Sequence, residues 1–424
     1  MPRWALVAAV VTLLCAVAGV LIANFVGGET KIERHIERLY PLDDPRFMQE
    51  LGVLLGPPFV PGTQARALLN GDEIFPPMLE AIRSAQVSIT FETYIYWSGE
   101  VGRHFADALA ERARQGVKVH VLLDWVGSAK MDESLMASME QAGVRVKRFH
   151  PPHWSNLGRL NNRTHRKLLI VDGKLGFTGG VGVAPHWTGR AQDPEHWRDT
   201  HFQVEGPVVA QMQSVFIDNW IKVTGDVLHG PDYFPGLRPA GPASAQMFSS
   251  SPSGGSESMQ LMYLLAITAA SRSIDLSAAY FVPDDLTLQA LTEALKRGVK
   301  LRIVVPGEHI DSETVRKASR ATWGPLLQAG ATIAEYVPTM YHCKVMIVDG
   351  LLTSVGSTNF DNRSFRLNDE ATLNIIDRDF ANAQTATFEA DLALARPVSF
   401  EAWQDRPLRE KFFEWLASLI DTQL

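Results

Sequence analysis

The residues of this chain whose types and spacing suit chemistry form a repeated pattern, His-x-Lys-x-x-x-x-Asp. It occurs twice, as His165, Lys167 and Asp172 and as His342, Lys344 and Asp349. Near neutral pH an imidazole can act as a nucleophile or carry a proton, and an ammonium group is a point charge that suits phosphate oxygens. Lysine is a poor metal ligand, and the histidine spacing matches no usual zinc pattern. The pattern therefore predicts phosphoryl chemistry at a duplicated site, with no metal or other cofactor.

Each copy of the pattern predicts a β-hairpin. Residues 164–171 and 341–348 read as strands, followed by an Asp-Gly turn and a returning strand. Because side chains alternate along a strand, the histidine and the lysine of each copy project from the same face. Asp172 and Asp349 lie in the turns, where aspartate is common because it tolerates the backbone geometry. We count both as members of the pattern and interpret their role as structural.

Small residues and acids follow each hairpin. Residues 179–182 read Gly-Gly-Val-Gly and residues 356–359 read Gly-Ser-Thr-Asn, which allows close backbone approach to an anion. Ser357 and Asn359 are candidate phosphate-binding residues. Asp199 and Glu370 are candidate histidine-orienting residues, since a carboxylate bonded to one ring nitrogen fixes the imidazole tautomer.

These strings resemble the phospholipase D superfamily and, within it, the bacterial cardiolipin synthases. The matching segments are residues 161–167, 177–180, 197–201, 280–284 and 356–361, spread over 65–424. The resemblance implies a covalent phosphohistidine, with His165 as nucleophile and His342 as acid and base. The near-symmetric sequence leaves the reverse assignment open. One departure is Gly182, which stands where the family usually carries Asn.

The chain also repeats outside the motifs, which sets its predicted fold. Helix-to-strand segments near residues 81–89 recur near 266–274, and a Pro- and Gly-rich stretch near 240 separates the two copies. We predict an α/β fold of two phospholipase D-type α/β/α units in a pseudo-twofold pair, with largely parallel strand pairing. The predicted divisions are an anchor at 1–28, a juxtamembrane segment at 29–64, and units at 65–240 and 241–424.

Two segments bear on membranes. Residues 4–26 carry no charged side chain and are long enough for one transmembrane helix, with a cleavable signal peptide as the alternative. Arg3 precedes this stretch while Lys31, Arg34 and Arg38 follow it, which favours a cytoplasmic catalytic part at the cell membrane. Near the C-terminus, apolar residues recur at helical spacing from Leu408 to Ile420. We expect this helix to pack on the core, because it lacks the lysine excess of membrane-binding helices.

Together these features predict a phosphatidyl transferase that joins two phosphatidylglycerol molecules and releases glycerol. The expected partners are the phospholipid substrate and the membrane. A net charge of −7 argues against broad nucleic-acid binding, so none is expected. The alternatives are a phospholipase D-type hydrolase, a metal-independent nuclease, and an inactive scaffold in which Gly182 marks lost function.

Overall fold

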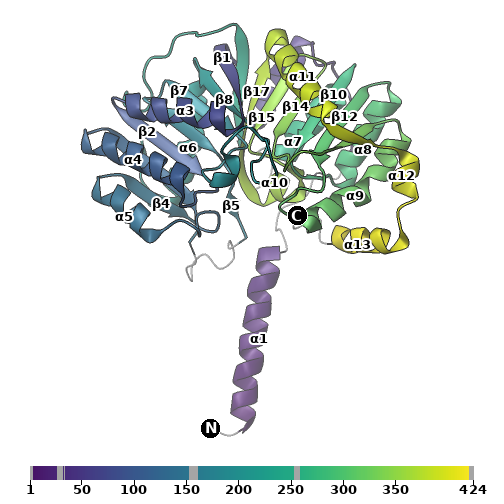
Figure 1. Ribbon diagram of the computed structural model, residues 1–424, viewed down its shortest axis with the longest axis horizontal. Helices are drawn as coiled ribbons and strands as arrows, with labels where there is room; N and C mark the ends of the chain where they lie inside the picture. Colours follow the sequence, from purple (N-terminus) through teal and green to yellow (C-terminus); the bar gives the residue numbers. More distant parts are fainter. Residues whose placement is uncertain (1–2, 26–31, 33, 152–160, 253–257, 420–424) are drawn as a thin grey trace.

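A mixed sheet of 16 strands runs through both halves of the chain (Figure 1). This computed structural model describes residues 3–25, 32, 34–151, 161–252 and 258–419, with side chains of the first helix described through residue 19. The first half contributes β1 (Val60–Leu69), β2 (Ser88–Thr93), β3 (Lys118–Asp124), β4 (Arg145–Phe149), β5 (Arg163–Thr164), β6 (Leu168–Val171), β7 (Leu175–Gly179) and β8 (Thr200–Glu205). The second half contributes β9 (Ala243–Ser250), β10 (Ser273–Ala278), β12 (Lys300–Pro306), β13 (Thr332–Tyr336), β14 (Lys344–Val348), β15 (Leu352–Gly356), β17 (Asn368–Ile376) and β18 (Ala395–Val398). A separate two-stranded sheet joins β11 (Phe281–Val282) and β16 (Phe360–Asp361).

The strand order shows the duplication. Outward from the central pair of β1 and β9, one half runs β1-β8-β7-β6-β2-β3-β4 and the other runs β9-β17-β15-β14-β10-β12-β13, with β18 at the far edge. The predicted duplicated α/β fold is therefore confirmed. Among the described residues, the parallel pairs of the 16-stranded sheet are those of β2-β3-β4, those of β10-β12-β13 and the short β5–β17 contact. The prediction of largely parallel pairing was wrong for the inner strands, which pair antiparallel because hairpins connect them.

Helices cover both faces of the sheet (Figure 1). Their bounds are α2 (Pro45–Leu55), α3 (Asn70–Ser84), α4 (Glu100–Arg114), α5 (Glu133–Gln141), α6 (Val208–Thr224), α7 (Met259–Ala269), α8 (Asp285–Lys296), α9 (Glu313–Gln328), α10 (Asn362–Arg366), α11 (Arg378–Ala393), α12 (Phe400–Gln404) and α13 (Leu408–Ser418). One hydrophobic core lies under α3 and α4, and another lies under α7, α8 and α9. A third core, against α6 and α11, contains side chains from both halves. The third core therefore joins the two halves, in addition to the separate core under the helices of each half.

The central strands are buried on both faces, which explains their sequence. All four residues of β6 and all five of β14 are buried, so these strands read as continuous apolar runs after the lysines. Some helices begin at side-chain caps, as at Asp284, whose carboxylate accepts from the Thr287 amide 2.9 Å away at the start of α8. The apolar sequences of β6 and β14 therefore match their burial in the structure.

The N-terminal helix α1 (Arg3–Phe25) has 23 residues, and the large apolar side chains described in it are exposed. It stands apart from the two-lobed body in Figure 1. Over the residues that the structure describes, no helix meets the length and apolarity needed to cross a membrane. The predicted transmembrane helix is therefore not supported.

Candidate active site

The two motif histidines are each bound to the backbone of the opposite half. β5 pairs with the start of β17, and the His165 amide donates to the Asp369 carbonyl at 2.9 Å. At the equivalent position of the other copy, Arg198 pairs with Tyr341, and the His342 amide donates to the Arg198 carbonyl at 2.7 Å. The duplication therefore places each histidine beside the acidic segment of the other half.

The acids then bond the rings across the same boundary. Nδ1 of His165 lies 3.0 Å from each carboxylate oxygen of Glu370, and Nδ1 of His342 lies 2.7 Å from Oδ2 of Asp199. All four side chains are buried. A carboxylate on Nδ1 fixes the ring orientation and directs Nε2 to any chemistry. The predicted orienting residues are thus brought to the histidines, in a crossed pairing.

Glu370 is held by hydroxyl groups of its own half. Ser357 Oγ donates to Oε2 at 2.5 Å, and Ser364 Oγ donates to Oε1 at 2.7 Å. Ser357 Oγ also accepts from the Ala371 amide at 3.0 Å. Ser357, predicted to bind phosphate, is therefore engaged in holding the carboxylate that orients His165.

Asp199 is held by a tryptophan instead of a serine. Trp187 Nε1 donates to Asp199 Oδ2 at 2.9 Å, and the Thr200 amide donates to Oδ1 at 2.7 Å. The Trp187 ring also meets the His342 ring edge-on, with centroids 5.4 Å apart. At Gly180 a Cβ atom would lie 2.3 Å from Asp199 Oδ1, so this position admits no side chain.

Gly182 belongs to the same arrangement. A Cβ atom there would lie 2.8 Å from Ile95 Cβ and 3.1 Å from Cζ3 of Trp187. The indole and Ile95 fill the space in which the family's usual Asn would begin. Gly182 therefore leaves no space for a side chain beside Trp187 and Ile95, and the first half has no Asn side chain at this position.

The motif lysines lie over their own histidines. Lys167 Nζ donates to the His165 carbonyl at 2.7 Å, and Lys344 Nζ donates to the His342 carbonyl at 2.8 Å. Lys344 Nζ also lies 3.2 Å from Nε2 of His342. Both lysines are buried, which lowers their pKa values, and an anion that enters the site favours their charged form.

Burial and pairing shift the pKa values of these groups in opposite directions. Burial lowers the pKa of His165 to about 4 against the opposing charge of Glu370, and lowers the pKa of Lys167 to about 7. The pKa of His342 is also lowered, by burial and by Lys344. Burial alone would raise the pKa values of Asp199 and Glu370, but the neighbouring histidines and lysines outweigh it and lower both. The site therefore combines neutral imidazoles with ionised carboxylates near pH 7.

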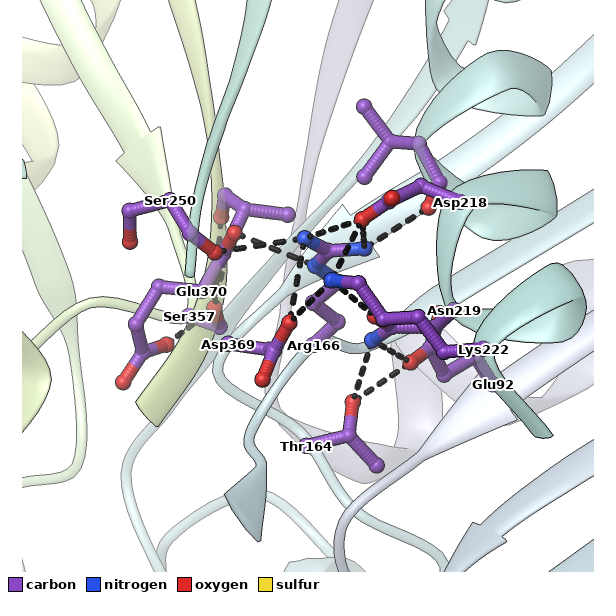
Figure 2. A network of polar contacts seen from close by, with 12 residues as sticks. Glu92, Thr164, Arg166, Asp218, Asn219, Lys222, Ser250, Ser357, Asp369 and Glu370 are labelled. Carbon is purple, nitrogen blue, oxygen red and sulfur yellow. Dashed lines mark hydrogen bonds and ion pairs between the residues drawn. The ribbon is translucent and has the colours of Figure 1, made fainter. Parts of the chain in front are cut away.

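Two buried arginines hold the acidic segments from behind. Arg166 donates to the carbonyls of Val215, Ser250 and Glu370 and to the carboxylate of Asp218, so it links α6 to β9 and β17 (Figure 2). Arg198 donates to the Asp199 carbonyl at 2.7 Å and binds Asp391 through two parallel hydrogen bonds. Each arginine thus fixes the backbone of a histidine-orienting acid.

Comparisons with known proteins match this geometry. A family model described as "Cardiolipin synthase, PLD-like domain" matches residues 78–220 and 263–392. A cardiolipin synthase of Geobacillus sp. (strain WCH70) is 36% identical over 85% of this chain and 72% of its own length. Cardiolipin synthase A of Pseudomonas fluorescens (strain Pf-5) is 35% identical over 84% of this chain and 73% of its own. This chain belongs to the cardiolipin synthase family.

Solved structures share the fold of this cardiolipin synthase family member. Phosphatidylserine synthase of Haemophilus influenzae Rd KW20 aligns with a TM-score of 0.67 at 12% identity, over 89% of this chain and all of its own. Polyphosphate kinase of Porphyromonas gingivalis aligns with a TM-score of 0.55 at 13% identity, over 93% and 57%. At such identities the likeness concerns the fold alone.

The two motif aspartates lie at the far ends of the motif strands in this cardiolipin synthase family member. Asp172 accepts the amides of residues 86–88, and Asp349 accepts those of residues 271–273, at 2.7–3.1 Å. Both have positive φ, 53° and 55°, and precede a glycine with positive φ, as a tight hairpin turn requires. Each aspartate therefore closes its hairpin turn and holds the start of a neighbouring strand, β2 in the first half and β10 in the second.

Other residues near the rings carried weaker signals. Asn359, the remaining predicted phosphate ligand, is buried with its Oδ1 atom unbonded among the described residues. Tyr94 meets the His165 ring edge-on at 5.1 Å. Tyr94, Trp187 and the two arginines were not predicted, although both arginines lie within the segments 161–167 and 197–201 that resemble the family. Within the described residues, no group of three or more His, Cys, Asp or Glu side chains is placed to hold a metal ion.

Proposed function

We propose that this protein is a phosphatidyl transferase of the phospholipase D type that makes cardiolipin from two molecules of phosphatidylglycerol. The crossed histidine–carboxylate pairs carry the proposal, because they orient two imidazoles that belong to different halves of the chain. Family membership supports the phospholipid substrate. We further propose phosphatidylglycerol as the substrate, His165 as the nucleophile with His342 as acid and base, and a second phosphatidylglycerol as the acceptor.

In the first half-reaction, Nε2 of His165 attacks phosphorus of one phosphatidylglycerol. The bond from phosphorus to the glycerol headgroup oxygen breaks. His342 takes up a proton when the anionic phosphate binds and favours its charged form, and it supplies that proton to the oxygen. Glycerol leaves, and a phosphatidyl group remains on His165. Glu370 stabilises the positive charge that develops on the His165 ring.

In the second half-reaction, neutral His342 takes the proton from a glycerol hydroxyl of another phosphatidylglycerol. That oxygen attacks phosphorus, the bond to His165 breaks, and cardiolipin is released. His342 is then protonated and ready for the next cycle. Water in place of the hydroxyl gives phosphatidic acid, so the acceptor is selected by the shape of the site.

The buried ammonium groups stabilise the transferring group. Lys167 and Lys344 lie over the histidines, where they neutralise charge on the non-bridging phosphate oxygens. A bound phosphate raises their depressed pKa values, because an anion within a few Å favours the charged form. Asn359 supplies an amide donor from the second half.

We also propose that α1 holds the enzyme at the cell membrane, with the catalytic part on the cytoplasmic side. The exposed apolar side chains of α1 support this. We expect wild-type protein to remain in the membrane pellet after a high-pH carbonate wash and the double variant Leu13→Asp, Leu14→Asp to be released. Release of both proteins would reject α1 as the attachment.

The reaction is tested with purified full-length protein and phosphatidylglycerol vesicles, with products identified by mass spectrometry. Cardiolipin and glycerol in equal amounts are expected. Phosphatidic acid without cardiolipin would instead identify a hydrolase. Cleavage of single-stranded DNA with no action on lipid would identify a nuclease.

A further inference from the structure

Helix α13 exposes its apolar face and buries a charged side chain, whereas a surface helix usually does the opposite. Leu408, Phe412, Trp415 and Leu419 are spaced by four, three and four residues, so they lie along one face. Their exposed fractions are 83%, 55%, 54% and 57%. Glu414, by contrast, is only 3% exposed. The predicted packing of the apolar face on the core was therefore wrong.

Ion pairs keep α13 in this orientation. Arg406 donates to Glu414 Oε2 at 2.9 Å, and Arg320 of α9 lies 3.0 Å from Oε1. Rotating the helix to bury its apolar stripe would break these pairs and leave buried arginine charge uncompensated, which is costly. The outward direction of the stripe is thus fixed by the polar side of the helix.

A contiguous apolar stripe of this size needs a partner. Single exposed apolar residues are normal on a protein surface. Here Phe413 and Leu416 are exposed as well, so the apolar surface is wider than one row of side chains and runs the length of the helix. Tryptophan, phenylalanine and leucine are the residues that an interfacial helix inserts among lipid headgroups.

The aromatic residues of the stripe and its position favour a lipid surface as that partner, even though the helix has no excess of lysine. Lys317 and Arg409 lie over the Phe413 ring, 5.7 and 5.8 Å from its centroid, where they flank the stripe with positive charge. Anionic phospholipids attract such flanking cations. Figure 1 shows α13 at the lower edge of one lobe and β5, the strand beside His165, low in the other lobe.

We infer that α13 is an interfacial helix that inserts its stripe of Leu408, Phe412, Trp415 and Leu419 into the surface of an anionic phospholipid bilayer. The inference rests on the proposed lipid substrate. By lying in the headgroup layer, α13 holds the edge that bears the active site against the bilayer, from which the substrate enters. It is a second lipid contact, separate from α1.

Quenching of Trp415 fluorescence tests the contact without needing turnover. Full-length protein is bound to phosphatidylglycerol vesicles with brominated acyl chains, and the signal of Trp415 is taken as the difference between wild type and Trp415→Phe. We expect that signal to be quenched relative to vesicles without bromine. The matched difference for the buried Trp323 of α9, obtained with Trp323→Phe, should not change. An unquenched Trp415 would overturn the inference, even if the enzyme makes cardiolipin.

Kinetics test the consequence for substrate entry. On vesicles, the double variant Phe412→Ser, Trp415→Ser should be slower than wild type by about fivefold or more. On monomeric short-chain phosphatidylglycerol, its rate should stay within about twofold of wild type. Val227→Ser, Leu394→Ser alters two side chains of similar exposure elsewhere and should match wild type on both substrates. Equal losses on both substrates would contradict the inference. Conversion of a dimer to a monomer by the α13 variant would do so as well, since the stripe would then bind a second copy.

Discussion

The carboxylate of Glu370 lies 3.0 Å from Nδ1 of His165, although 205 residues separate them in the chain. Asp199 and His342 repeat the relationship in the opposite direction, at 2.7 Å. Each half therefore supplies one histidine and the acid that orients the other half's histidine. Correct orientation of either ring requires both halves to be docked.

Removing the charge of an orienting acid should impair catalysis while leaving the fold intact. For Glu370→Gln and for Asp199→Asn we expect kcat to fall about 10²- to 10⁴-fold, because the amide no longer stabilises the charged imidazole or fixes its tautomer. Steady-state kinetics on phosphatidylglycerol measure this, with thermal unfolding to verify folding. Glu335→Gln is the control, since Glu335 is a buried acid paired with Arg316 outside the site. An equal loss in the control would show that general destabilisation explains the effect.

Trp187 should act on kcat through Asp199. Trp187→Phe keeps most of the packing but removes the 2.9 Å hydrogen bond, so we expect kcat to fall by up to about tenfold with KM nearly unchanged, as one hydrogen bond to a charged group implies. Trp323→Phe also removes one indole hydrogen bond, to Ser319, from a buried position and should leave kcat unchanged. A change in KM alone would contradict the assigned role.

Gly182 should not accept the family's usual residue. In Gly182→Asn the new Cβ would meet Ile95 and Trp187, so we expect the free energy of unfolding to fall by about 1–3 kcal/mol and no gain in kcat. Denaturant unfolding and steady-state kinetics measure the two effects. A stable, faster variant would show that a phosphate ligand is missing from the first half.

The motif aspartates should matter for stability rather than for chemistry. Asp172→Ala leaves three backbone amides without their acceptor and should lower the free energy of unfolding by about 1–3 kcal/mol, and the same holds for Asp349→Ala. Folded protein should keep a kcat within a few-fold of wild type. A stable variant without activity would place the aspartates in the catalytic set.

Acid should destabilise the protein through its buried histidines. Burial lowers the pKa values of His120, His165 and His201 to about 4, so between pH 6.5 and 4 the unfolded chain binds protons that the folded chain does not. The contribution of these histidines is therefore fully present above pH 6.5 and is lost as the pH falls, by up to about 1.4 kcal/mol per pH unit for each histidine. Glu92, Asp124 and Asp361 act in the opposite direction, because burial raises their pKa values to about 7, about 6 and about 6. Both ring nitrogens of His201 lack hydrogen-bond partners among the described residues. His201→Leu should reduce the slope by one proton in denaturant unfolding, and an unchanged slope would refute its buried neutral state.

The sequence allowed part of this site to be predicted, because hairpin periodicity places His165 with Lys167 and because the acids recur at matching positions. The crossed pairing was not predictable, since it depends on how β5 and β17 meet after the halves dock. The hydrogen bond from Ser357 to Glu370 was not predictable for a related reason, because a hydroxyl beside a phosphate site can bind a phosphate or a carboxylate. For α13, helical spacing located the apolar face but not its direction, which is set by ion pairs to Arg406 and Arg320.

The most direct test of the central claim is to trap the covalent intermediate. His342→Ala incubated with phosphatidylglycerol should gain the mass of one phosphatidyl group, located by peptide mass spectrometry on His165, while His165→Ala should gain none. Mixing the two variants should not restore cardiolipin formation, because both histidines belong to one chain's site. An adduct on His165→Ala, or activity recovered on mixing, would contradict the account.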